Sequence, residues 1–269
     1  MGLIQADMKF KAMKRIVHFN VILPADEEAQ PLEAYPTLYL LHGIYGNSTS
    51  WLANSNIRRY AEQHRLAVVM PDGENGFYLN HPEHMNNFSD FIGEELVDFT
   101  RRLLPLSRKR EDTYIGGLSM GGYGALVNGL RFPETFSRIV ALSAGLVLDD
   151  YVTNGDGASD IHGAGYYGAM FGPVETVLES PANPVWLAKQ LLAAGRPLPE
   201  ILMSCGVDDF LLSANRKAVR DFEAMGVPVT FRTAPGAHEW DFWDREIKHA
   251  IEHWLPQPGA AGADSDLAH

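Results

Sequence analysis

The fold is decided by residues 114–124, which read Tyr114-Ile115-Gly116-Gly117-Leu118-Ser119-Met120-Gly121-Gly122-Tyr123-Gly124. The segment Thr113-Tyr114-Ile115 is typical of a strand, and the segment from Tyr123 to Val127 is typical of a helix. Glycines between the two allow a corner that is too tight for larger side chains. The stretch therefore predicts a strand that turns sharply into a helix.

At this corner, residues 117–121 form the pattern G-x-S-x-G, which places a serine on a strained turn at the end of a strand. The strained backbone lets the hydroxyl of Ser119 project from the sheet. Very small residues must flank it wherever a Cβ would strike the neighbouring strand or helix, and Gly117 and Gly121 meet that requirement. The pattern predicts a nucleophilic Ser119; the alternative is a glycine turn without a chemical role.

Strand-like and helix-like segments alternate along most of the chain. This alternation predicts an α/β fold, with a mainly parallel central sheet and helices on both faces. In such sheets, ligands bind at the carboxyl ends of the strands. The expected strands are one or two within 8–23, then 37–41, 66–70, 113–115, 138–143, 201–206 and 227–233. The expected helices are 57–64, a helix with apolar residues at 92, 96, 99 and 103, a helix that ends near Pro133, 213–225 and 240–254.

Length and composition predict one domain. The chain has 269 residues, of which 46% are hydrophobic, so it can bury a large core. We expect a single α/β domain over residues 1–255. Within it, residues 147–196 have a weak pattern with one short helical piece at 184–194, which is typical of a cap-like insertion over a site. The Gly/Ala/Asp-rich end, 256–269, is expected to be disordered.

Charge and cysteine content argue against several classes of protein. Lys and Arg number 22 and Asp and Glu number 34, and the resulting net charge of −12 argues against binding to nucleic acid or to an acidic membrane surface. Cys205 is the only cysteine, which excludes an internal disulfide and a cysteine-rich metal site. His81 and His84 lie in a polar loop without suitable partners, so we expect no metal and no cofactor.

The N-terminal region carries charged residues every few positions, and no stretch has the length and apolarity of a signal peptide or a membrane span. These features predict a soluble, cytoplasmic protein whose partner is a small molecule. The sequence leaves the oligomeric state open, and a homo-oligomer is compatible with it.

The base and the acid that would activate Ser119 are indicated by their order in the chain. A serine hydroxyl needs a base to take its proton and a carboxylate to orient that base. In this architecture the order is serine, acid, histidine. His238 follows the expected strand 227–233 and is the candidate base. The acid should follow the strand 201–206, where Asp208 and Asp209 are adjacent and cannot both point at His238, so the residues alone leave both open.

A tetrahedral intermediate also needs hydrogen-bond donors for its oxyanion. In this architecture, one donor is the backbone N–H of the residue after the serine, here Met120, and the other belongs to the loop after an early strand. That loop contains Gly43, which permits close approach, so we expect the N–H of Ile44 to be the second donor. His42 has two interpretations, a base or a buttress of the loop, and its place before Ser119 favours the buttress.

Loop residues near these groups are candidates for contact with the substrate. They are Gly43, Tyr45, Phe77, Tyr78 and Trp240. We expect the loop 75–78 and the segment 147–196 to shape the side of the site that holds the alcohol. The alternative for the aromatic residues is that they close a hydrophobic edge without touching the substrate.

Five segments in order carry a resemblance to a known family. They are Leu40-Leu41-His42-Gly43 with Gly46-Asn47, Gly117 to Ala125, Phe132-Pro133-Glu134-Thr135-Phe136-Ser137, Cys205-Gly206 followed by Asp209-Phe210-Leu211, and Gly236-Ala237-His238-Glu239-Trp240. From about Phe19 to Trp254 the chain resembles the esterase D-like group of α/β-hydrolases, most closely its tributyrin esterase/acetylesterase branch.

The resemblance implies the α/β-hydrolase fold and an oxyanion hole formed by the N–H groups of Ile44 and Met120. It also implies Asp209 as the acid, because in that family the acid immediately precedes an aromatic residue and a leucine, here Phe210 and Leu211.

Together, the residues and the resemblance predict a serine carboxylesterase that hydrolyses short-chain acyl esters, from acetyl to butyryl, through an acyl-enzyme. Related alternatives are an S-formylglutathione hydrolase and a feruloyl or sugar-acetyl esterase. The S-formylglutathione hydrolases usually carry Leu-Thr-Cys after the His-Gly pair, where this chain has Ile44-Tyr45-Gly46, and this disfavours that alternative. The alternative from another class is a binding protein of this fold that has lost catalysis.

Overall fold

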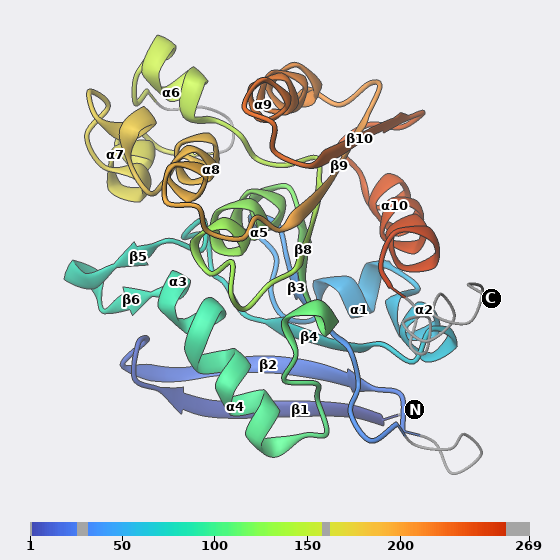
Figure 1. The fold of residues 1–269 in the computed structure, drawn as a ribbon. Helices are drawn as coiled ribbons and strands as arrows, with labels where there is room; N and C mark the ends of the chain where they lie inside the picture. Colours follow the sequence, from blue (N-terminus) through green and yellow to red (C-terminus); the bar gives the residue numbers. More distant parts are fainter. Residues whose placement is uncertain (1, 26–31, 158–161, 257–269) are drawn as a thin grey trace.

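The centre of the protein is an open eight-stranded sheet, seen in a computed structural model that describes residues 2–25, 32–157 and 162–256. The strand order is β1-β2-β4-β3-β7-β8-β9-β10 (Figure 1). The strands β3 to β10 of this sheet run parallel, and only the β1–β2 and β2–β4 pairs are antiparallel. Their bounds are β1 (Gly2–Phe10), β2 (Arg15–Leu23), β3 (Thr37–Leu41), β4 (Ala67–Pro71), β7 (Thr113–Leu118), β8 (Arg138–Leu142), β9 (Glu200–Gly206) and β10 (Val229–Ala234).

The predicted α/β fold with a mainly parallel sheet is confirmed. The strands β3, β4 and β7 are buried at every position, because helices cover both faces of the sheet where they lie. The N-terminal strand is longer than expected, since β1 begins at Gly2 rather than near Met8. It lies at the edge of the sheet and is mostly exposed, so its first residues lack the apolar pattern of a buried strand.

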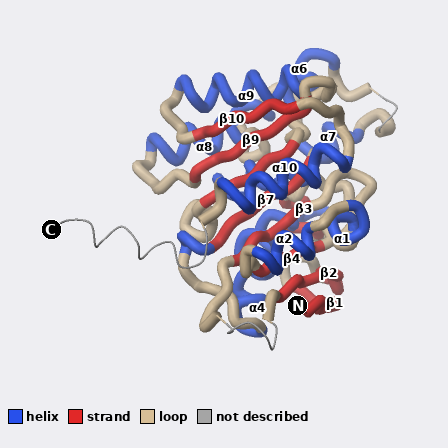
Figure 2. The backbone as a smooth tube through the Cα atoms, turned by 90° about the vertical axis from the view of Figure 1, so that its right-hand side faces the viewer, coloured by secondary structure: helices blue, strands red, loops and turns tan. Residues whose placement is uncertain are grey.

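Helices cover the two faces of the sheet with separate apolar clusters. One face is covered by α1 (Ser50–Asn54), α2 (Ile57–Gln63) and α10 (Trp240–His253), whose buried residues include Trp51, Ile57 and Phe242 (Figure 2). The other face is covered by α4 (Leu96–Leu103), α5 (Met120–Arg131) and α9 (Leu212–Ala224), with Leu96, Tyr123 and Phe222 in the core.

The helix expected from apolar residues at 92, 96, 99 and 103 is present but irregular. It begins with α3 (Phe88–Asp90), passes through a π-helical turn, η2 (Phe91–Glu95), and continues as α4. The π turn interrupts the regular helical register between Ile92 and Leu96. Leu103 is the last residue of α4 and is 56% exposed instead of facing the core. Gly93 lies in this turn against the ring of Phe132, which occupies the space that a Cβ would need.

The segment 147–196 contains more regular structure than its sequence predicts. It forms α6 (Leu148–Asn154), α7 (Tyr166–Phe171), a 3-10 turn η4 (Val177–Glu179) and α8 (Pro184–Ala193). These elements lie on the side of the sheet that α5 covers (Figure 1), and α8 packs against α5. The contacts that join this cap to the rest include a hydrogen bond from the hydroxyl of Tyr123 to the carbonyl of Ala182 and an ion pair in which Lys217 lies 3.1 Å from the carboxylate of Asp149.

Residues 74–87, expected to be a loop, contain a small antiparallel hairpin of β5 (Asn80–His81) and β6 (Asn86–Asn87) around a 3-10 turn, η1 (Pro82–His84). A further 3-10 turn, η3 (Arg110–Asp112), leads into β7. The tail predicted to be disordered, 256–269, lies outside the described residues apart from Pro256. Within the described ranges, no helix is both long enough and apolar enough to cross a membrane.

The corner between β7 and α5 depends on glycine at position 121, and this can be tested. A Cβ on Gly121 would lie 2.5 Å from the carbonyl oxygen of Leu41 and 2.6 Å from that of His42. Because backbone atoms cannot move aside, we expect Gly121→Ala to lower the free energy of unfolding by about 2 kcal/mol or more. Urea unfolding measures this difference.

The matched control is Gly157→Ala, since nothing lies within 4 Å of a Cβ at that exposed position. It should change the free energy of unfolding by less than about 0.5 kcal/mol. Equal stability of the two variants would contradict this explanation of the corner.

Candidate active site

Ser119 sits at the corner where β7 ends and α5 begins, in a strained backbone conformation. Its φ is 53° and its ψ is −120°, a combination that non-glycine residues rarely adopt. Hydrogen bonds hold it there: its N–H donates to the carbonyl of Leu142 at 2.9 Å, and its carbonyl accepts from Gly145 N–H at 2.8 Å and Tyr123 N–H at 3.0 Å. A Cβ on Gly117 would meet the backbone of Gly121 at 2.5 Å, which explains the small residues around the serine.

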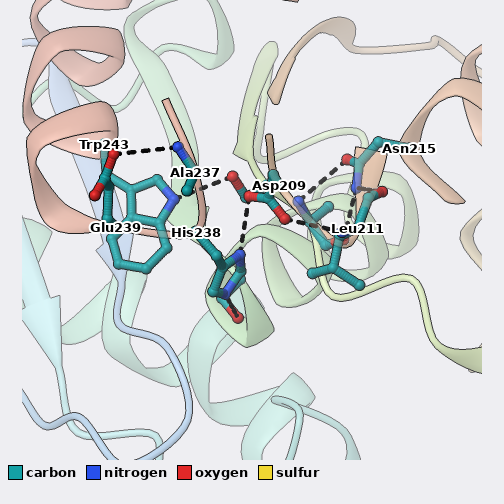
Figure 3. Close-up of polar contacts among 10 residues, drawn as sticks. Asp209, Leu211, Asn215, Ala237, His238, Glu239 and Trp243 are labelled. Atoms are coloured by element: carbon teal, nitrogen blue, oxygen red, sulfur yellow. Dashed lines mark hydrogen bonds and ion pairs between the residues drawn. The ribbon is translucent and has the colours of Figure 1, made fainter. Parts of the chain in front are cut away.

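The structure brings Ser119, His238 and Asp209 into one line. His238 Nε2 lies 3.0 Å from Ser119 Oγ, and His238 Nδ1 lies 3.0 Å from Asp209 Oδ2. The Asp209 side chain is fully buried, whereas the neighbouring Asp208 is exposed and uses its N–H to bond the carbonyl of Gly236. The sequence alone did not decide between Asp208 and Asp209 as the acid; in the structure, Asp209 is the one that contacts the imidazole (Figure 3).

The surroundings of Asp209 favour its ionised form. Burial by itself would raise the pKa of this carboxyl, but hydrogen bonds from His238, from the N–H of Leu211 and from Ser143 lower the pKa below its ordinary value. The Leu211 N–H lies 2.9 Å from Asp209 Oδ1. An ionised carboxylate at this place can hold the imidazole in one orientation and stabilise its protonated form.

Buried Asn215 fixes the loop that carries Asp209. Its Nδ2 donates to the carbonyls of Leu211 and Ala144, each at 2.9 Å, and its Oδ1 accepts from the N–H of Ala144 at 3.1 Å (Figure 3). This amide therefore joins the loop after β9 to the segment after β8. Because Asn215 lies inside a helix, the sequence contains no signal that marks it as part of the site.

Two aromatic rings enclose the imidazole of His238. The ring of Phe210 lies 4.7 Å away, and the ring of Trp243 lies 4.9 Å away at nearly a right angle. Trp243 Nε1 also donates to the hydroxyl of Ser143 at 3.1 Å, and Ser143 in turn bonds Asp209. The sequence analysis missed the contribution of Phe210, Trp243 and Ser143, although the position of Phe210 directly after Asp209 is a signal that could have found it.

His42 buttresses the loop after β3, as its place in the chain predicts. Its Nδ1 lies 2.7 Å from the carbonyl of Gly43, and its Nε2 accepts from the N–H of Gly73 at 2.9 Å, so the ring carries its proton on Nδ1. Burial lowers its pKa, against opposing effects of the Gly43 carbonyl and Asp72. Both ring nitrogens are therefore occupied, and the imidazole is unable to serve as a second base.

A pocket of about 650 Å³ opens beside Ser119 and His238. Gly43 lies next to the serine, since a Cβ there would be 3.4 Å from the Cβ of Ser119. Two aromatic side chains at the pocket are largely exposed, Tyr45 at 70% and Phe210 at 64%. The full lining is Gly43, Ile44, Tyr45, Gly46, Ser50, Asn54, Leu118, Ser119, Phe210, His238, Glu239, Trp240 and Trp243.

Of the expected substrate contacts, Gly43, Tyr45 and Trp240 line this pocket, but Phe77 and Tyr78 do not. Phe77 is 5% exposed and packs against Phe171 of the cap, with ring centroids 4.8 Å apart. Tyr78 is fully buried, and its hydroxyl donates to the carbonyl of His42 at 2.9 Å. Both side chains are therefore buried in the core and do not line this pocket, and both residues have positive φ values, 50° for Phe77 and 57° for Tyr78.

The cap does not line this pocket either: none of its described residues, 147–157 and 162–196, is among the lining. The expectation that the cap directly shapes the alcohol side is therefore corrected. His81 and His84, the weak indication of a metal, lie in the β5–β6 hairpin region away from Ser119, and the described residues contain no group of three or more His, Cys, Asp or Glu suited to a metal ion.

A serine on a strained strand-to-helix corner, an imidazole within bonding reach and a buried carboxylate define a serine hydrolase of the α/β-hydrolase type. Residues 11–253 match the family model Esterase, described as "Putative esterase". The chain belongs to this esterase family.

Similar proteins agree with this assignment. An acetyl esterase from Caldicellulosiruptor saccharolyticus is 36% identical over 262 residues, which cover 95% of this chain and 98% of that protein. Among solved structures, FphF of Staphylococcus aureus, a fluorophosphonate-binding serine hydrolase determined with substrate bound, has a TM-score of 0.83 and 30% identity, and the match covers 93% of this chain and 96% of that one.

The S-formylglutathione hydrolase FrmB of Staphylococcus aureus, solved as the apoenzyme, has a TM-score of 0.80 and 29% identity over 93% of this chain and 98% of that one. The family, these relatives and the fold together show that the protein is a serine carboxylesterase, as the sequence predicts.

The choice between the adjacent aspartates can be tested by replacing each. Asp209→Ala removes the carboxylate that contacts His238 Nδ1, so we expect kcat for p-nitrophenyl acetate to fall by about 10³–10⁴. Asp208→Ala removes only an exposed side chain, and its kcat should stay within about twofold of the wild type. A larger loss of kcat in the Asp208 variant than in the Asp209 variant would show that the acid is Asp208 and not Asp209.

The lowered pKa of Asp209 makes a further prediction, on stability. A carboxyl whose folded pKa lies below its ordinary value of 3.8 stabilises the fold fully above that value, and the contribution is lost as the pH falls through the folded pKa. We therefore expect the wild type to be more stable than Asp209→Asn at about pH 6, with a difference that shrinks below about pH 4. Urea unfolding at several pH values measures it; a difference independent of pH would contradict the lowered pKa.

Proposed function

We propose that Ser119 is the nucleophile, His238 the general base and acid, and Asp209 the residue that orients and stabilises His238. The observation that carries the proposal is the pair of 3.0 Å contacts that joins the serine oxygen, the imidazole and the buried carboxylate. The groups come from the ends of β7, β9 and β10, so the sheet itself sets their separation.

In the first step, Ser119 Oγ attacks the carbonyl carbon of the ester while His238 Nε2 takes the hydroxyl proton. The tetrahedral intermediate then collapses: the bond to the alcohol oxygen breaks, and that oxygen receives the proton from His238. Water attacks the resulting acyl-serine, with His238 again accepting a proton and returning it to Ser119 Oγ as the carboxylic acid leaves. Ionised Asp209 stabilises the imidazolium in both halves of the reaction.

The loop after β3 supports Ile44 as one oxyanion donor. The carbonyl of Gly43 accepts from His42 Nδ1 at 2.7 Å and from Gly46 N–H at 3.0 Å, so its direction is fixed. The peptide unit is planar and trans, and the N–H of Ile44 must therefore point the opposite way. The other proposed donor is the N–H of Met120, the first residue of α5. The first N–H groups of a helix have no partner within the helix, so this one is available to an oxyanion.

The pocket supports a small uncharged or cationic ester as the substrate. Glu239 is the only acidic residue among the described residues of its lining, and no Lys or Arg is among them. The chain's net charge of −12 acts in the same direction. Glutathione thioesters carry two carboxylates that would find no cation here, so we propose an oxygen ester as the substrate class.

A short acyl group is the chain length that we propose. The buried apolar side chains of Leu118 and Trp243, 3% and 6% exposed, line the pocket together with Ser119. Similarity to an acetyl esterase over 95% of the chain supports an acetyl or butyryl group in this place. A feruloyl or sugar-acetyl ester differs from this proposal in its acyl or its alcohol part, and it is separated by the experiment below.

The proposal is tested by one variant and one substrate panel. We expect Ser119→Ala to lower kcat for p-nitrophenyl acetate by about 10⁵ or more. The wild type should turn over the acetyl and butyryl esters with higher kcat/KM than the octanoyl ester, a feruloyl ester or S-formylglutathione. The proposed short acyl group disfavours the octanoyl and feruloyl esters, and the described lining has no Lys or Arg to pair with the carboxylates of S-formylglutathione.

The control variant is Ser137→Ala, whose hydroxyl bonds only backbone carbonyls of Glu111 and Thr113. Its kcat should match the wild type. If Ser119→Ala retained hydrolysis, Ser119 would not be the nucleophile, and the alternative of a binding protein without catalysis at this site would be favoured. A preference for S-formylglutathione would overturn the proposed substrate class.

A further inference from the structure

The loop 72–78 is a scaffold for the loop that carries the proposed oxyanion donor. Hydrogen bonds from both backbone and side chains join the two loops. They include Gly73 N–H to His42 Nε2 at 2.9 Å, Tyr78 hydroxyl to His42 carbonyl at 2.9 Å, Ser48 N–H to Asp72 Oδ1 at 2.8 Å and Tyr45 N–H to Asn75 Oδ1 at 2.9 Å.

The bond from Asn75 differs from the other three because it acts on the residue directly after Ile44. Tyr45 has a φ of 64°, a left-handed conformation that costs a non-glycine residue about 1 kcal/mol or more. The side chain of Asn75 accepts the N–H of Tyr45 and so holds this conformation. If that acceptor were removed, Tyr45 could relax toward an ordinary φ, which would turn the peptide between Ile44 and Tyr45. That turn would, through Ile44, displace the preceding peptide unit, which joins Gly43 to Ile44 and carries the N–H of Ile44.

Asn75 is itself held from the cap. The hydroxyl of Tyr166, on α7, donates to the backbone carbonyl of Asn75 at 2.5 Å. Burial raises the pKa of Tyr166 to about 12, with smaller effects from Tyr167 and Tyr45, so the hydroxyl keeps its proton and remains a donor at neutral pH. The ring of Tyr166 also lies 6.2 Å from that of Phe77, which anchors the same loop in the core.

We propose that Asn75 is a positioning residue for the oxyanion loop, and that Tyr166 ties the cap to it. A continuous chain of contacts runs from Tyr166 to Asn75, to the N–H of Tyr45 and to the adjoining Ile44. The cap, which does not line the pocket, thereby influences catalysis through the placement of a backbone donor. This inference rests on the proposed function, in which the N–H of Ile44 stabilises the oxyanion.

The expected signature is a loss in kcat with little change in KM. An oxyanion donor acts on charge that develops only in the transition state, and loss of one donor costs about 10²–10³ in kcat. Displacement without loss should cost less, so we expect Asn75→Ala to lower kcat for p-nitrophenyl acetate by about 10- to 100-fold, with KM within about twofold. The pocket itself does not contain Asn75, which is why binding should be preserved.

Two further variants separate positioning from general damage to the loop. Asn75→Asp keeps an oxygen acceptor for the Tyr45 N–H, and we expect it to recover kcat to within about fivefold of the wild type. Glu74→Ala is the matched control: it changes the adjacent residue and breaks its ion pair with Arg15, but leaves the acceptor in place, so kcat should stay within about twofold. Wild-type kcat in Asn75→Ala, or no recovery in Asn75→Asp, would overturn the role of Asn75.

Tyr166→Phe tests the link to the cap, because it removes only the hydroxyl that donates to Asn75. We expect kcat to fall by about 3- to 10-fold with KM unchanged, and no additional loss when the change is combined with Asn75→Ala. Wild-type kcat in Tyr166→Phe, or fully multiplicative losses in the double variant, would overturn the link. Failure of the proposed function is distinct, since it would appear as activity retained in Ser119→Ala.

Discussion

The reactive edge of this protein depends on the strained backbone of one residue. At φ 53° and ψ −120°, Ser119 would ordinarily be disfavoured by about 1–3 kcal/mol, so the surrounding structure must supply at least that much. Its N–H donates to the carbonyl of Leu142 and its carbonyl accepts from the N–H groups of Gly145 and Tyr123, so its backbone is held on both sides. Glycine at 121 lets the first turn of α5 pack against the end of β3. The strain directs the hydroxyl away from the sheet and toward His238.

The other groups reach Ser119 because parallel strands end at one edge. Asp209 follows β9 and His238 follows β10, and these strands lie beside each other in the sheet. Further side chains then fix the loops: Asn215 joins the Asp209 loop to the segment after β8, while His42 and Asn75 hold the loop after β3. The sheet sets the separation of the groups, and buried polar contacts set their orientation.

The sequence predicts the parts of this site that depend on short-range requirements. The glycines around Ser119 and the apolar runs of β3 and β4 are constraints that neighbouring residues impose, so they are visible in one chain. The order of serine, acid and histidine follows instead from the expected fold, and only the family resemblance indicates Asp209 rather than Asp208. Contacts between distant segments leave no local pattern.

Phe77 and Tyr78 look like surface aromatics in a polar loop, and only their burial in the structure and the packing of the Tyr78 ring against Gly124 of α5 show that they face inward. Other features could not be predicted from the sequence for the same reason. They are the π turn before α4, the short helices α6 and α7, and the hydrogen bond from Trp243 to Ser143.

The central claim, that His238 activates Ser119 for covalent attack, is tested most directly by mass spectrometry after reaction with a fluorophosphonate. Attack by the serine oxygen displaces fluoride and leaves a phosphonyl group on the protein. The account predicts a single adduct that maps to Ser119 and forms far more slowly when His238 is replaced by alanine. An adduct on another residue, or the same rate of labelling without the imidazole, would contradict it.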